Sequence, residues 1–90
     1  MNVERVVIVD GRKDFPAPGQ VTADVLVNEH RARCVVAFTD YGAEYIQQDW
    51  PMGWLPNVWW AVYRVMGRIH RGEEISFPLD VTAEAAEGSL

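Results

Sequence analysis

Apolar side chains recur every three to four residues between Leu55 and Arg71, in the longest periodic stretch of the chain. At about 100° per residue this spacing predicts an amphipathic helix, because residues three and four apart share one face. Pro56 suits the first helical turn, where its missing N–H has no helical partner, and Gly72 follows as a C-terminal stop. The predicted apolar face contains Leu55, Val58, Trp59, Val62, Tyr63, Met66, Ile69 and His70.

The opposite face of this helix has an unusual composition. It holds Asn57, Trp60, Ala61, Arg64, Gly67, Arg68 and Arg71, with three arginines and no acid. One interpretation is a solvated face whose arginine stems cover apolar surface. The other is a contact surface, because Trp and Arg anchor interfaces and Gly67 allows close approach of a partner.

Period-two alternation and runs of β-branched residues predict four strands. Their predicted ranges are Val3–Asp10, Val21–Asn28, Ala32–Thr39 and Glu74–Val81. Two prolines and two glycines make Gly11–Gln20 a loop. Pro78 lacks a backbone N–H and therefore places the last strand at a sheet edge.

The stretch after the third strand is harder to assign. Asp40 is a good N-cap, so residues 41–49 are predicted to form a short helix in which Tyr41 and Tyr45 stack at i, i+4. Trp50 precedes Pro51, which disfavours helix there, so residues 50–54 form a linker. Residues 83–90 are predicted to be a frayed acidic tail.

These elements give an α+β fold in the order β-β-β-(short α)-α-β. We expect an antiparallel β-meander of three strands plus a returning edge strand, packed on one main helix, within a single domain of residues 1–82. Val6, Ile8 and Leu26 suggest apolar residues on the second sheet face too. The 41–49 segment, the Phe15 loop or another protomer must cover them, so a homodimer is expected.

Composition narrows the functional classes. The net charge of −5 disfavours general affinity for nucleic acid, which requires phosphate neutralisation. The basic helix lies between two acidic segments. A single cysteine, the absence of a signal-peptide pattern and the lack of an apolar run of about 18 residues predict a cytoplasmic protein with no membrane span.

Residues for catalysis or metal binding are few. His30, Cys34 and His70 are the soft metal ligands, and they form no CxxC or HxxxH spacing. Cys34 lies in an apolar strand, where a buried inert thiol is usual. No glycine-rich phosphate loop is present. We therefore predict no catalytic residue, no metal and no cofactor.

A second candidate surface combines aromatic and acidic residues between positions 40 and 54. Its aromatic members are Tyr41, Tyr45, Trp50 and Trp54. Such a cluster either caps the core or binds a basic partner.

The sequence therefore favours a small non-enzymatic protein-interaction domain with an accessory, regulatory or inhibitory role. A variant of this hypothesis is an acidic mimic of nucleic acid. One alternative is nucleic-acid contact through Trp60, Arg64, Arg68 and Arg71, which ranks below a protein partner. Another is a ligand-binding or enzyme fold that uses the 40–54 loop.

Overall fold

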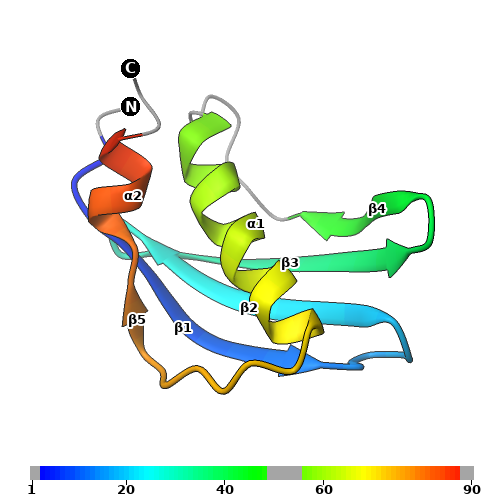
Figure 1. Ribbon diagram of the computed structural model, residues 1–90. Coiled ribbons are helices and arrows are strands. Elements are labelled where there is room, and N and C mark those ends of the chain that lie inside the picture. Colours follow the sequence, from blue (N-terminus) through cyan, green and yellow to red (C-terminus); the bar gives the residue numbers. More distant parts are fainter. Residues whose placement is uncertain (1–2, 49–55, 88–90) are drawn as a thin grey trace.

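The computed structural model describes residues 3–48 and 56–87 of the chain. Its elements in chain order are β1 (Val6–Lys13), β2 (Gln20–Val27), β3 (His30–Thr39), β4 (Gly42–Gln48), α1 (Pro56–His70), β5 (Leu79–Asp80) and α2 (Thr82–Glu87). All pairings are antiparallel, and the strands are ordered β4-β3-β2-β1-β5. Helix α1 runs across one face of this sheet (Figure 1). The predicted α+β fold, a meander with a returning edge strand and a main helix, is confirmed.

The predicted helix at 41–49 is wrong, because residues 42–48 form β4. Asp40 and Tyr41 make a two-residue turn that Thr39 fixes: its hydroxyl accepts from the Tyr41 N–H at 3.3 Å and donates to the Gly42 carbonyl at 3.2 Å. Gly42 has a φ of +137°, which no helix contains. Pairing with β3 therefore overrides the local helix preference of the segment.

The core lies between the sheet and α1. On β2, Val21, Ala23, Val25 and Val27 face the helix and are fully buried. Val6 and Ile8 of β1 join them, so the expectation that these two lie on the second face is wrong. The reason is the phase of the strand, which turns Val7 and its cross-strand neighbour Leu26 outward instead.

Helix α1 follows its predicted boundaries and has a glycine stop. Gly72 has a φ of +86°, its N–H donates to the Ile69 carbonyl, and the Glu73 N–H donates to the Arg68 carbonyl. This is the Schellman arrangement that ends many helices. The predicted phase is partly wrong, however: Asn57 and Ala61, expected on the polar face, are buried, whereas Trp59 is only half-buried.

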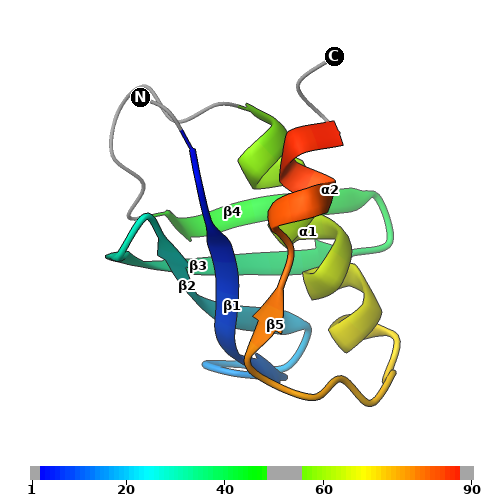
Figure 2. The same ribbon diagram turned by 90° about the vertical axis from the view of Figure 1, so that its left-hand side faces the viewer.

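The helix α2 explains this phase error. Residues 83–87, predicted to fray, belong to α2, which packs on α1 and β1 (Figure 2). Ala85 is 1% exposed, and its carbonyl accepts a hydrogen bond from the Asn57 side-chain amide. The C-terminal helix thus covers a flank of α1 that an isolated amphipathic helix would leave in solvent.

The last strand is shorter than predicted. Only Leu79 and Asp80 pair with β1, whereas the predicted range began at Glu74. The alternation is still meaningful, because Ile75 and Phe77 pack against the core from an irregular segment and Leu79 does so from β5. Its edge position is as expected from Pro78.

Candidate functional site

The exposed side of α1 presents the Trp/Arg surface, which we define as Trp60, Arg64, Arg68 and Arg71. Trp60 is 55% exposed, and the three arginines are exposed as well. The helical spacing places Trp60, Arg64 and Arg68 in one row along α1, and Arg71 follows directly after its last residue. A large exposed aromatic on a rigid helix gives a binding surface with little ordering cost.

Two of the three arginines are held by an acid just beyond the helix. Arg68 Nε lies 3.3 Å from Glu73 Oε1, and Arg71 Nη2 lies 3.4 Å from Glu73 Oε2. All three side chains are solvent-exposed, so these pairs add little stability. Arg64 makes no ion pair within the described part of the chain. Arg64, which lies next to Trp60, is therefore the arginine of the Trp/Arg surface whose charge is least neutralised.

Gly67 does not leave an open approach for a partner in this conformation. A Cβ built at this position would lie 3.4 Å from Arg71 Nη1. The Arg71 guanidinium therefore folds back over Gly67 while it reaches Glu73. A partner backbone could contact Gly67 only after Arg71 moved away.

An aromatic cluster that the sequence did not predict lies beside Trp60. Tyr63 contacts Trp59 at a ring-centroid distance of 5.5 Å, Trp60 at 5.7 Å in an edge-on arrangement, and Phe38 at 5.8 Å. Phe38 also stacks on His70 at 4.6 Å. The cluster holds the Trp60 ring from one side, and it links α1 to β3. Only the alternation of β3, which turns Phe38 toward the helix, hinted at it.

The predicted acidic-aromatic surface is not assembled as expected. Tyr41 is fully exposed in the β3–β4 turn, and Tyr45 belongs to β4, opposite Val36. The helical i, i+4 spacing that was to bring these two tyrosines together therefore does not exist. Trp50 and Trp54 lie outside the described residues.

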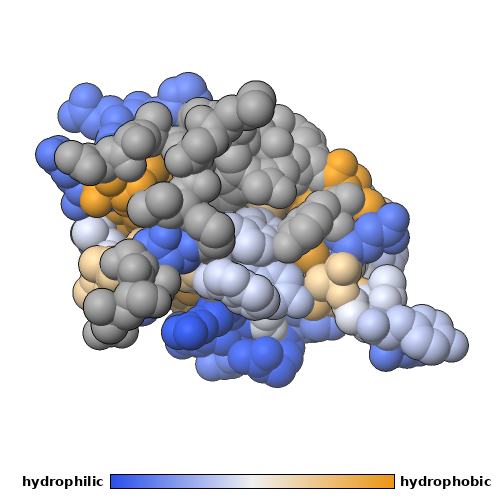
Figure 3. Space-filling model, turned by 90° about the horizontal axis from the view of Figure 1, so that it is seen from above, coloured by the Kyte–Doolittle hydropathy of each residue, from blue (hydrophilic) through white to orange (hydrophobic). Residues whose placement is uncertain are grey.

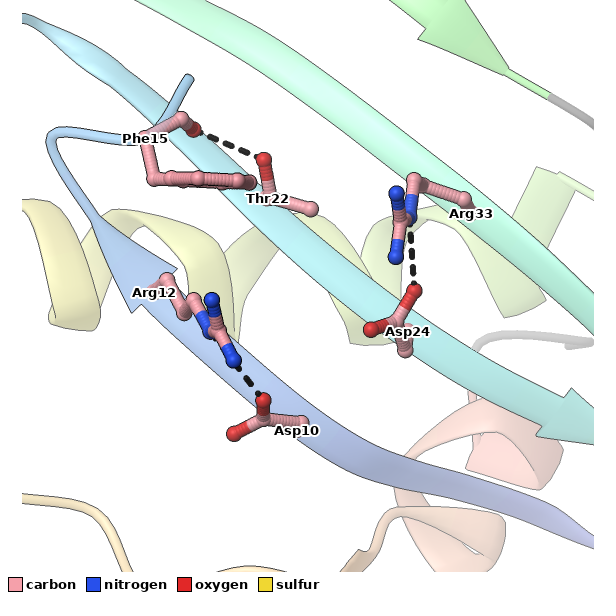
Figure 4. Close-up of polar contacts among 6 residues, drawn as sticks. All are labelled: Asp10, Arg12, Phe15, Thr22, Asp24 and Arg33. Carbon is pink, nitrogen blue, oxygen red and sulfur yellow. Dashed lines mark hydrogen bonds and ion pairs between the residues drawn. The ribbon is translucent and has the colours of Figure 1, made fainter. Parts of the chain in front are cut away.

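The sheet face away from the helices carries several polar contacts in addition to the apolar residues Val7 and Leu26 (Figure 4). Arg33 Nε lies 2.9 Å from Asp24 Oδ1, and Arg12 Nε lies 3.4 Å from Asp10 Oδ2. The Phe15 loop reaches this face, because the Thr22 hydroxyl donates to the Phe15 carbonyl at 2.7 Å. An open depression of about 330 Å³ is lined by Val9, Asp24, Val25, Arg31, Ala32 and Arg33. Ion pairs and the loop thus adapt much of this face to water.

Ligands for a metal are scattered. No group of three or more His, Cys, Asp or Glu side chains among the described residues could hold a metal ion. Cys34 is fully buried on the helix side of β3, as predicted for an inert thiol. His30 begins the same strand and is exposed. Within the described ranges, no helix is both long enough and apolar enough to cross a membrane.

One face of the molecule shows how its apolar residues are distributed there. Seen from above, the visible apolar residues form separate patches with hydrophilic residues between them (Figure 3).

Comparisons with protein-family models, curated proteins and solved structures gave no match for this chain. Any functional inference must therefore rest on the surfaces described above.

Proposed function

We propose that this chain is a non-enzymatic protein-interaction domain, with an accessory, regulatory or inhibitory role, and that the Trp/Arg surface of α1 contacts its partner. The observation that carries the proposal is Trp60, which is 55% exposed although its helix, α1, contributes many buried residues to the core. Trp and Arg are the residues most enriched at binding hot spots. Tyr63 supports the Trp60 ring, so that little side-chain freedom is lost on binding.

The charges of this surface indicate the chemistry of the partner. Arg64 lies one helical turn from Trp60, and Arg68 and Arg71 continue the row. A matching partner offers an apolar pocket for the indole ring and carboxylates at its rim. Such rim charges mainly steer the encounter and set the orientation, whereas the buried indole supplies most of the affinity.

A nucleic-acid partner has less support. Glu73 pairs with two of the three arginines, and the net charge of −5 opposes a polyanion. The acidic-mimic variant has less support too, because Asp10, Asp24 and Glu73 each pair with an arginine instead of presenting a free carboxylate.

The proposal is tested by measuring a partner complex with matched variants. Partners are captured from the source cells on immobilised wild-type protein, identified by mass spectrometry, purified and titrated by calorimetry. Trp60→Ala should weaken the complex by about 2 kcal/mol or more, roughly 30-fold in Kd, as for a hot spot. Phe15→Ala removes an exposed aromatic from the other sheet face and should leave Kd unchanged. Equal Kd values for Trp60→Ala and wild type would refute the proposal.

A second measurement separates the nucleic-acid alternative. Fluorescence anisotropy with a single-stranded oligonucleotide at low salt should show no binding. If binding occurs, if Glu73→Gln strengthens it, and if Arg64→Glu with Arg68→Glu abolishes it, the surface binds phosphates and the protein-partner proposal fails.

A further inference from the structure

Strand β4 is the long open edge of the sheet. It is last in the order β4-β3-β2-β1-β5, so no described strand pairs with its outer side (Figures 1 and 2). It is seven residues long, and Ala43, Glu44 and Ile46 are exposed, with Ile46 at 50%. Among the described strands, helix α1 packs mainly on β1 and β2, which lie away from this edge.

The two edges of the sheet differ in their protection against pairing. Sheet edges are commonly protected by shortness, proline, lysine or bulges. At the other edge, β5 has two residues and directly follows Pro78. Strand β4 contains no proline, lysine or arginine, and Glu44 is its single charge. Its one protective feature is a bulge, where the register with β3 skips Ile46.

We propose that β4 pairs antiparallel with β4 of a second copy of this chain, about a two-fold axis near Tyr45. A strand edge is its own antiparallel complement, so one surface suffices for a symmetric interface. Two copies of the chain repel one another, because each carries a net charge of −5. Pairing through β4 limits this repulsion at the interface, because each β4 strand contributes a single carboxylate. An axis near Tyr45 sets Glu44 opposite Ile46 of the second copy, so the two carboxylates do not face each other.

The size of the interface sets its strength. Pairing two seven-residue strands covers less than the roughly 1,600 Å² of a standard stable interface. We therefore expect a weak dimer with a dissociation constant of about micromolar order, as is usual for interfaces below the standard size. This inference uses β4 and not the Trp/Arg surface, so it goes beyond the proposed function and stands independently of it.

Sedimentation equilibrium of the intact chain from about 1 to about 500 µM tests the proposal, because this range brackets micromolar dissociation constants. The wild type should shift from its monomer mass of 10.2 kDa toward twice that value. Ile46→Lys places an edge-protecting lysine on an exposed side chain and should remain monomeric throughout. Ser76→Lys adds the same charge to an exposed position near the opposite edge and should dimerise like wild type.

Amide hydrogen exchange of the wild type provides a readout that does not depend on a variant folding. Alternate β4 amides face away from β3, and they should become protected as the concentration rises. The proposal is wrong if the wild type stays at 10.2 kDa at every concentration. It is equally wrong if a dimer forms without protecting these amides, or if folded Ile46→Lys dimerises as wild type does.

Discussion

Gly11 and Gly67 both lack a Cβ atom, and this lack has opposite consequences for stability at the two positions. A Cβ at Gly11 would lie 2.5 Å from Ile69 Cδ1 and 2.9 Å from Phe77 Cζ. This glycine therefore allows the end of α1 and the segment before β5 to pack closely on β1. Gly67, in contrast, lies in the interior of α1 with ordinary van der Waals space around it.

We therefore expect Gly11→Ala to lower the free energy of unfolding by about 1–3 kcal/mol, because a well-packed site must shift to admit the methyl group. Gly67→Ala should instead raise it by about 0.5–1 kcal/mol, because alanine loses less backbone entropy in a helix. Urea unfolding of both variants measures the two effects. If Gly11→Ala leaves the free energy of unfolding unchanged or raises it, the close packing at Gly11 is contradicted; a lowered value for Gly67→Ala would contradict the expectation for Gly67.

At the scale of the element, the side chain of Asp80 caps the N-terminus of α2. The Asp80 Oδ1 atom accepts the Thr82 N–H at 2.8 Å. Hydrogen bonds from the Thr82 side chain and backbone, together with the nearby Arg5 charge, lower the pKa of the Asp80 carboxyl. A carboxylate at a helix start also interacts favourably with the helix dipole.

This arrangement predicts a specific pH dependence of stability. The folded pKa of Asp80 lies below its ordinary value of 3.8, so the folded state binds fewer protons than the unfolded state as the carboxyl titrates. The stabilisation is present above that value and is lost as the pH falls through the folded pKa. Asp80→Asn should therefore be less stable than wild type at pH 6, and the difference should shrink toward pH 2.

Urea midpoints measured across this pH range check the prediction. Asp40→Asn is the matched control, because it removes the same charge from an exposed residue in the β3–β4 turn, far along the chain from α2. A wild-type-to-Asp80→Asn difference that stays constant from pH 6 to pH 2 would contradict the proposed role of the carboxylate.

The elements also show what could be predicted from the sequence. The boundaries of α1 followed from Pro56, Gly72 and the apolar period, which are local signals. The phase of its buried face did not, because α2, which is distant in sequence, packs on α1 and bonds to the side chain of Asn57. The strand at 42–48 was missed for the same reason, since its pairing with β3 outweighs local preference.

The candidate surface was predictable to the same extent. The exposure of Trp60 and the arginines followed from their positions on α1, whereas the support from Tyr63 and the capture of two arginines by Glu73 did not. The Tyr63 ring also packs on Phe38 of β3, a contact between elements distant in sequence. The two arginines reach Glu73 because the chain turns at Gly72. Their role in binding remains a prediction.

On the scale of the whole molecule, the sheet is unevenly protected from solvent. Strand β2 lies at the centre of the sheet and is covered by α1, whereas β4 and β5 are edges. In dilute solution, we expect β2 amides to exchange slowest and those of β4 and β5 to exchange fastest, because edges open without unfolding the core. Exchange followed by NMR measures this order, and equal protection of β2 and β4 in the monomer would contradict it.

The bonds around Val6 have a consequence for synthesis. The Val6 N–H donates to Thr82 Oγ1 at 2.9 Å, and these two residues lie 76 positions apart in the sequence. The Val6 carbonyl accepts a hydrogen bond from the Val81 N–H. During synthesis, β1 leaves the ribosome long before β5 and α2. The edge of β1 that pairs with β5 therefore stays unpaired while the rest of the sheet is synthesised. Closure of the domain is therefore a late event, and a chaperone that shields β1 would act in that interval.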